Sequence, residues 1–94
     1  MTTVIAFHEV EDGERWAKSW QKGPGSRHEM FAEIGITGAR TFRDPENPNS
    51  TGLILEVSDM EKVQAALASD EMKQAMAEDG LKVETLRMLA EFTA

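Results

Sequence analysis

Strand-like and helix-like periodicities alternate along this chain of 94 residues. Two helical segments place apolar residues three and four apart, and each lies between stretches in which apolar residues alternate with others. The predicted strands are 4–10, 38–44, 51–57 and 83–92, and the predicted helical segments are 14–34 and 58–79. The order β-α-β-β-α-β predicts an α+β, ferredoxin-like fold as a single domain over residues 1–94. Its four strands form an antiparallel sheet, with the helices on one face.

Each helical segment is predicted in two pieces. Gly23 suits the left-handed position after a helix, and Pro24 prevents the helix from continuing. Ser26 and Glu29 then form a capping box, which predicts a new helix start. In the second segment a box at 58–61 and the stretch "SDEM" at 69–72 give the same signals. The "GPGS" break is not a phosphate loop, because it follows a helix and lacks the G-K-[ST] ending.

The composition excludes several classes of function. The chain has no cysteine, so it has no disulfide and no zinc–cysteine site. Its two histidines lack acidic neighbours at ligand spacing, so no metal site is expected. A net charge of −7 disfavours nucleic acid. No signal peptide or apolar run of membrane length is present, which predicts a cytoplasmic protein without membrane contact.

One segment departs from the acidic total. Residues 15–43 hold six Lys or Arg against two Glu, in a chain of net charge −7. This segment either forms a solvated face or attracts a small anionic ligand.

Three segments carry a resemblance to a known family. They are the broken helix "ERWAKSWQKGPGSRHEMFAEIG", the hairpin "ARTFRDPENPNSTGLILEV" and the segment "SDMEKVQAALASDEMKQAMAEDG". In these features the chain resembles the dimeric α+β barrel superfamily, which includes antibiotic-biosynthesis monooxygenase-like domains. The resemblance implies a homodimer that pairs the open sheet faces of two subunits into a barrel. It also implies that the first strand is central, between the third and the fourth.

The resemblance carries over no catalytic residue. The polyketide monooxygenases of the superfamily use Trp, Asn and Tyr near the pocket, and this chain has no tyrosine. The haem-degrading members place Asn on the first strand and Trp on the third, and neither is present at those positions here.

Alternation along the strands separates two predicted sheet faces. The face assigned to the helices is almost wholly apolar and holds Ile5, Phe7, Leu53, Leu55, Val57, Leu86, Met88, Ala90 and Phe92. The face assigned to the partner subunit is mixed and holds Val4, Ala6, His8, Ile54, Glu56, Thr85, Arg87 and Leu89. On this assignment His8, Glu56 and Arg87 lie together. They form either a general base with its charged partners or a satisfied polar cluster at the interface.

The aromatic residues suggest where a ligand would bind. Trp16 and Trp20 are four residues apart and share a helix face. They either anchor the helix to the sheet or, with Phe31 and Phe42, form the walls of a pocket for a flat apolar molecule. His28, near the start of a capped helix, is either exposed or directed at the pocket mouth.

Two functions follow from these residues. The first is a small cofactor-independent enzyme, of cyclase, monooxygenase or isomerase type, that acts on an apolar or aromatic molecule. His8 or His28 would be its acid or base, and Arg87 or Arg40 would stabilise an anion. The second is a non-catalytic homodimer that binds a ligand or a partner protein.

Overall fold

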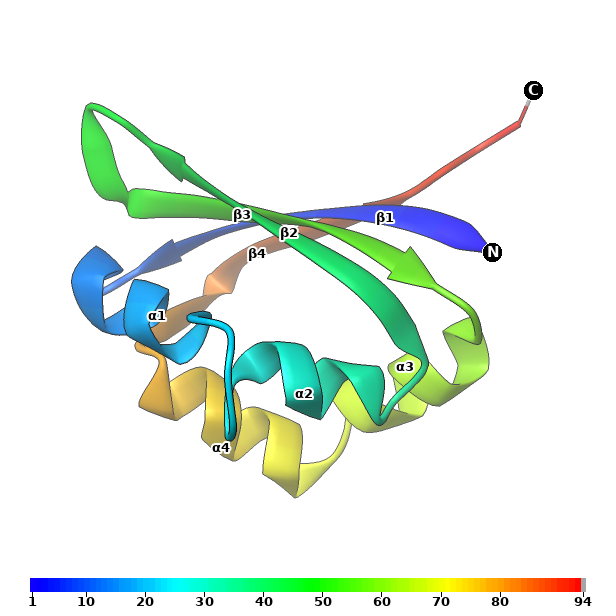
Figure 1. Ribbon diagram of the computed structural model, residues 1–94. Coiled ribbons are helices and arrows are strands. Elements are labelled where there is room, and N and C mark those ends of the chain that lie inside the picture. Colours follow the sequence, from blue (N-terminus) through cyan, green and yellow to red (C-terminus); the bar gives the residue numbers. More distant parts are fainter. Residues whose placement is uncertain (94) are drawn as a thin grey trace.

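A computed structural model describes residues 1–93 and contains the predicted elements in the predicted order (Figure 1). The elements are β1 (Thr2–Val10), α1 (Gly13–Ser19), α2 (Arg27–Ala32), β2 (Ile36–Asp44), β3 (Asn47–Val57), α3 (Met60–Leu67), α4 (Asp70–Glu78) and β4 (Leu81–Ala90). The ferredoxin-like α+β fold is therefore confirmed, and each helical segment is divided in two as expected. The 38–57 hairpin is more extended than predicted, because its strands continue to a turn at residues 45–46.

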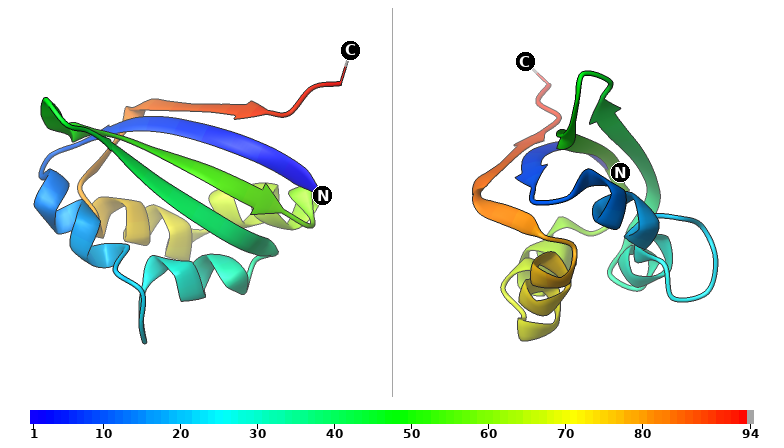
Figure 2. Two further views of the ribbon diagram at one scale, coloured as in Figure 1. Left: turned by 45° about the horizontal axis from the view of Figure 1, so that its top comes forward. Right: turned by 90° about the vertical axis from the view of Figure 1, so that its left-hand side faces the viewer.

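The four strands form one antiparallel sheet in the order β2-β3-β1-β4. The first strand is thus central, as the resemblance implied. All four helices lie against the same face, and the opposite, bare face carries no helix from residues 1–93 (Figures 1 and 2). The fold therefore offers two places for a functional site: the space between the helices and the sheet, and the surface of the bare face.

Short polar side chains set the helix starts. The hydroxyl of Ser26 accepts from the backbone N–H of Glu29, so the predicted start of α2 is confirmed. Ser69 caps α4 in the same way. The predicted cap of α3 by Ser58 is wrong, because the carboxylate of Asp59 accepts from the N–H of Lys62. The Ser58 hydroxyl donates instead to the carbonyl of Gly35, at 2.9 Å.

The predicted faces of β1 are reversed in the structure. Val4 and Ala6 are buried under the helices, whereas Ile5 and Phe7 are 37% and 50% exposed on the bare face. Both faces of "VIAFHEV" are apolar, so alternation alone does not say which is inward, and a shift by one residue exchanges every side chain. The helix face of β1 meets the bulky indoles of α1, and the smaller side chains fit there. The faces predicted for β3 and for residues 86–89 of β4 are correct. Val4 and Ala6 lie on the helix face, and they pair with Leu55 and Met88, which were predicted on that face.

Within residues 1–93 no helix is both long enough and apolar enough to cross a membrane.

Candidate functional site

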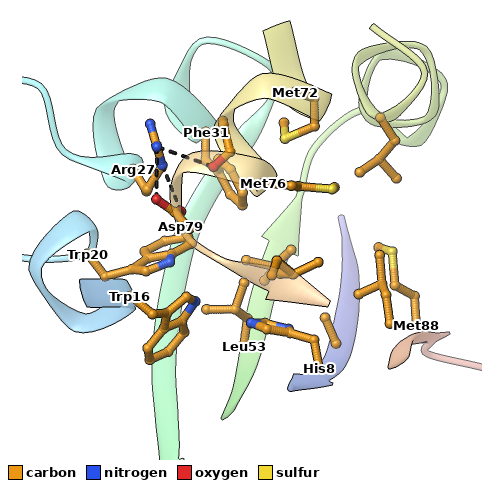
Figure 3. A pocket seen from close by; sticks show the side chains of 16 residues that line it. His8, Trp16, Trp20, Arg27, Phe31, Leu53, Met72, Met76, Asp79 and Met88 are labelled. Carbon is orange, nitrogen blue, oxygen red and sulfur yellow. Dashed lines mark hydrogen bonds and ion pairs between the residues drawn. The ribbon is translucent and has the colours of Figure 1, made fainter. Parts of the chain in front are cut away.

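A cavity of about 70 Å³ lies between the helix layer and the sheet. Its wall is almost wholly apolar and comes from strands β1, β3 and β4 and from all four helices. Figure 3 shows His8 and Met88 on the sheet side, Trp16 and Trp20 along one side, and Met72 and Met76 on the helix side. The lining residues are Ala6, His8, Trp16, Trp20, Arg27, Phe31, Leu53, Leu55, Leu67, Met72, Ala75, Met76, Asp79, Leu81, Leu86 and Met88.

His8 is the polar group that the sheet contributes to this cavity. It lies at a break in the pairing of β1 with β4, where the register shifts between Phe7 and Glu9. Such bulges redirect side chains and are frequent beside active sites. The backbone carbonyl of His8 accepts from the hydroxyl of Thr51 at 2.8 Å, which fixes the strand at this point. The imidazole packs edge-on against Trp16, with ring centroids 5.7 Å apart.

Both ring nitrogens of His8 are buried without a hydrogen-bond partner in the part of the chain that the structure describes. The residue is only 4% exposed. Burial lowers the pKa of His8 from its usual value of 6.5, and the negative charge of Asp79 partly opposes this shift. At neutral pH the imidazole is therefore uncharged, with one nitrogen able to donate and the other able to accept a proton.

A buried ion pair supplies the other polar atoms of the cavity wall. Arg27 begins α2 and Asp79 is the C-cap of α4. The guanidinium Nε and Nη2 donate to the two carboxylate oxygens of Asp79, both at 2.9 Å. The Nη2 also contacts Glu78 at 3.3 Å and the carbonyl of Ala75 at 3.5 Å. Hydrogen bonding to Asp79 raises the pKa of Arg27, which stays charged.

Trp20 is the centre of an aromatic cluster beside the cavity. Its ring lies 6.3 Å from that of Trp16 and meets Phe31 edge-on at 4.9 Å. His28 also meets Trp20 edge-on, at 5.1 Å, but does not line the cavity. Of the four aromatic residues predicted as a pocket wall, Trp16, Trp20 and Phe31 line the cavity, whereas Phe42 does not.

The remaining predicted site residues lie on the bare face of the sheet. Arg40 and Phe42 are on β2, with the Arg40 guanidinium carbon 5.4 Å from the Phe42 ring centroid. Arg87 pairs with Phe7, which is exposed on that face. The predicted group of His8, Glu56 and Arg87 is wrong, because His8 points to the helices. Glu56 instead accepts the hydroxyl of Thr3, at 2.9 and 3.1 Å.

The bare face is apolar at its centre. Phe7, Phe42 and Ile54 surround Gly52, and a shallow hollow of about 290 Å³ lies over this glycine. Leu89, which is 53% exposed, pairs with Ile5 on the same face. This surface is separated from the His8 cavity by the thickness of the sheet.

Comparison with known proteins identifies the fold. No protein-family model matches the chain, and no curated protein matches its sequence. Solved structures do match. One is SnoaB, a cofactor-independent oxygenase from Streptomyces nogalater, with 22% identity, 99% of this chain and 91% of that chain covered, and a TM-score of 0.68. An antibiotic biosynthesis monooxygenase has 12% identity, 100% and 99% coverage and a TM-score of 0.65. The chain has the fold of the antibiotic biosynthesis monooxygenase-like proteins.

The same fold occurs beyond the named monooxygenases. A conserved protein from Methanosarcina mazei Go1 matches with 17% identity, 99% and 92% coverage and a TM-score of 0.63. At such identities the likeness establishes the fold alone. The predicted resemblance to antibiotic biosynthesis monooxygenase-like domains is therefore confirmed at the level of fold.

The sequence analysis did not predict Asp79 as a lining residue of the cavity, nor its pairing with Arg27. Arg27 belonged to a basic segment that also fits a solvated face, and Asp79 follows an ordinary helix end. The two residues are 52 positions apart, so no local pattern links them. Met72 and Met76 are four apart on one helix stripe, a signal typical of core packing as well as of a cavity wall. Within residues 1–93, no three His, Asp or Glu side chains come together as metal ligands would.

Proposed function

We propose that the protein binds an uncharged, apolar or aromatic small molecule in this cavity and that His8 takes a proton from it. The observation that carries the proposal is the buried imidazole of His8, whose two nitrogens have no partner within residues 1–93. An unpartnered buried polar group costs about 1–3 kcal/mol, so its presence calls for a reason. A ligand that hydrogen-bonds to His8 supplies one.

The chemistry follows from the charge state of the imidazole. A neutral histidine accepts a proton from an acidic O–H or C–H of the ligand, and the electron pair of that bond stays on the ligand as a phenolate or enolate. The imidazolium that forms lies in the field of the Asp79 carboxylate, which favours the protonated state. This proton transfer is the first step that cyclisation, isomerisation and cofactor-independent oxygenation have in common.

The cavity wall indicates an uncharged ligand. Arg27 is the one cation that lines it within residues 1–93, and it already binds Asp79 and Glu78, so it offers no free charge to a carboxylate. The other wall groups are apolar apart from His8. A volume of about 70 Å³ is smaller than the ~150 Å³ that accommodates benzene in a protein core. Binding therefore requires side chains to move, and the flexible thioethers of Met72, Met76 and Met88 permit this.

The fold supports an enzyme of this kind. SnoaB, which matches nearly the whole chain, is a cofactor-independent oxygenase. We carry over the reaction class as a proposal, since a site of this type relies on protein groups and the ligand's own reactivity. His28 and Arg87, both candidates from sequence, have no part in the proposed proton transfer, because neither lines the cavity.

We further propose that the protein is a cytoplasmic homodimer joined through the bare sheet face. Ile5, Phe7 and Leu89 are large apolar side chains exposed there, together with Phe42. Contiguous apolar surface of this kind favours association, and an isologous pairing satisfies both copies at once.

A ligand screen read by tryptophan fluorescence tests the proposed function. Uncharged phenols and enolisable aromatic ketones are expected to change the emission of Trp16 and Trp20 and to give products detectable by mass spectrometry. His8→Phe preserves a ring against Trp16 but removes the base, so turnover should fall by about 10²-fold or more. His28→Phe is the matched control and should retain turnover. Turnover that survives in His8→Phe would exclude His8 as the base.

A second function is favoured by the tight aromatic packing beside the cavity. The edge-on contacts of Trp20 with Phe31 and His28 fit a rigid wall that holds a ligand without chemistry. In that case ligands shift the fluorescence in the same way, His8→Phe weakens binding, and no product forms. The product measurement therefore separates an enzyme from a binding protein.

A further inference from the structure

The Arg27–Asp79 ion pair is buried between helices α2 and α4. The two side chains are only 16% and 9% exposed, so both charges are largely removed from water. Burying an ion pair gives little net stability compared with apolar side chains of similar size. The pair nevertheless lies in the wall of an otherwise apolar cavity, which it shares with His8 (Figure 3).

The geometry of the pair determines what Asp79 can do. Each carboxylate oxygen receives one N–H from Arg27 at 2.9 Å, in a bidentate arrangement. Such charge-assisted pairs are strong and directional. Both oxygens are thereby turned toward the guanidinium, and no hydrogen bond forms between Asp79 and His8 within the described chain. The imidazole keeps both nitrogens available even though a carboxylate lies in the same cavity.

Within residues 1–93, no other charged side chain lines the cavity. Helix α2 contributes Arg27 and helix α4 contributes Asp79, and Glu78 approaches from outside through Arg27. The parts of α1, α3, β3 and β4 that line it are apolar or aromatic. The negative charge that acts on His8 is that of Asp79, and its counter-charge is the guanidinium of Arg27, at hydrogen-bond distance. In a buried site of low dielectric, such charges act strongly on a neighbouring titratable group.

We propose that Arg27 is a positioning residue, which acts on His8 through Asp79 and thereby keeps the imidazole neutral and free of protein hydrogen bonds. Arg27 offsets the negative charge of Asp79 and holds its oxygens away from the ring. The use of this arrangement in proton transfer rests on the proposed function. The effect of the pair on the protonation of His8 is a property of the ligand-free protein, and it can be measured in that state.

Removing Arg27 and removing Asp79 should shift the pKa of His8 in opposite directions. In Arg27→Met the carboxylate of Asp79 loses its counter-charge and becomes free to accept from the imidazole, so the pKa of His8 rises. In Asp79→Asn the guanidinium of Arg27 is left without its carboxylate, so the pKa of His8 falls below that of the wild type. The double variant Arg27→Met/Asp79→Asn has no charge at either position and should lie between the two single variants.

NMR titration of the imidazole signals tests this directly, because the chain has two histidines and His28→Phe identifies the signal of His8. The expected result is an upward shift in Arg27→Met and a downward shift in Asp79→Asn. Glu14→Gln removes the exposed Arg43–Glu14 pair and serves as the control, with His8 unchanged.

A purely structural role of the pair predicts a different pattern. Loosening of the helices would admit water and move the pKa of His8 upward toward 6.5 in both single variants. An upward shift in Asp79→Asn therefore overturns the proposal. If the single variants do not fold, the uncharged double variant is measured alone. A return of the His8 pKa to 6.5 there would mean that the pair only keeps water out, and this would contradict the proposal. The two proposals can fail separately. If the pKa of His8 shifts as expected in the ligand-free variants but no ligand is turned over, the proposed function is rejected and this inference is retained.

Discussion

At the scale of single residues, the burial of His8 connects folding to pH. The folded protein binds a proton at His8 less tightly than the unfolded chain does, because burial lowers the pKa from 6.5. The unfolded state thus binds more protons once the pH falls below that value. The contribution of His8 is fully present above pH 6.5 and is lost as the pH decreases toward its folded-state pKa. We expect the free energy of unfolding, measured with urea, to fall as the pH decreases below 6.5.

Substitution of His8 isolates this effect. His8→Phe should remove that part of the pH dependence and raise the free energy of unfolding at neutral pH by about 1–2 kcal/mol, because it deletes unpartnered buried nitrogens. His28→Phe is the control and should leave the pH dependence attributed to His8 in place. An unchanged pH slope in His8→Phe would show that other groups cause it. A gain in stability with a loss of function is the pattern expected for a functional residue.

The sequence predicted some of these residues and missed others for identifiable reasons. The spacing of Trp16 and Trp20 placed both indoles on one helix face, and they do line the cavity. His8 was recognised as a candidate but assigned to the wrong face, because β1 is apolar on both sides. The contact between Arg27 and Asp79 spans 52 positions, and only the three-dimensional fold brings the two together.

At the scale of elements, the hairpin of β2 and β3 holds α1 in position over the cavity. The N–H of Gly13 donates to the side chain of Asn49 at 2.8 Å, and a Cβ at position 13 would overlap the carbonyl oxygen of Pro48. Gly13→Ala should therefore displace α1, with its two tryptophans, from the hairpin. We expect a loss of about 2 kcal/mol or more in the free energy of unfolding, measured by urea denaturation.

The matched control for this prediction is Gly38→Ala on β2. A Cβ there would lie 3.7 Å from the side chain of Glu56, which is ordinary contact. Its effect should stay within about 0.5 kcal/mol. Equal effects of the two substitutions would mean that the close approach of Gly13 to Pro48 is not what fixes α1. Sequence patterns located the hairpin and the starts of α2 and α4. The contact of Asn49 with α1 joins residues 36 positions apart, and no local pattern predicts it.

At the scale of the whole molecule, the bare sheet face accounts for the proposed association. Small domains bury a modest fraction of their surface, so a second copy adds substantially to the apolar area removed from water. Phe7 and Phe42 stand on either side of Gly52 and leave a hollow that a partner side chain can fill. The sequence predicted that this face would be partnered, yet it predicted Val4 and Ala6 on it. The exposure of Ile5 and Phe7 makes the face more apolar than predicted.

A single charge at the centre of this face tests the homodimer. Ile5 is 37% exposed on central strand β1, where it pairs with Ile54 and Leu89, and Ile5→Glu would bury an unpaired carboxylate in the interface of each copy. Desolvation of such a charge is costly, so the variant should be a folded monomer by light scattering where the wild type is a dimer. Ala65→Glu, on the exposed surface of α3, is the control and should remain dimeric. A dimeric Ile5→Glu, or a monomeric wild type at micromolar concentration, would rule out the bare sheet face as the interface.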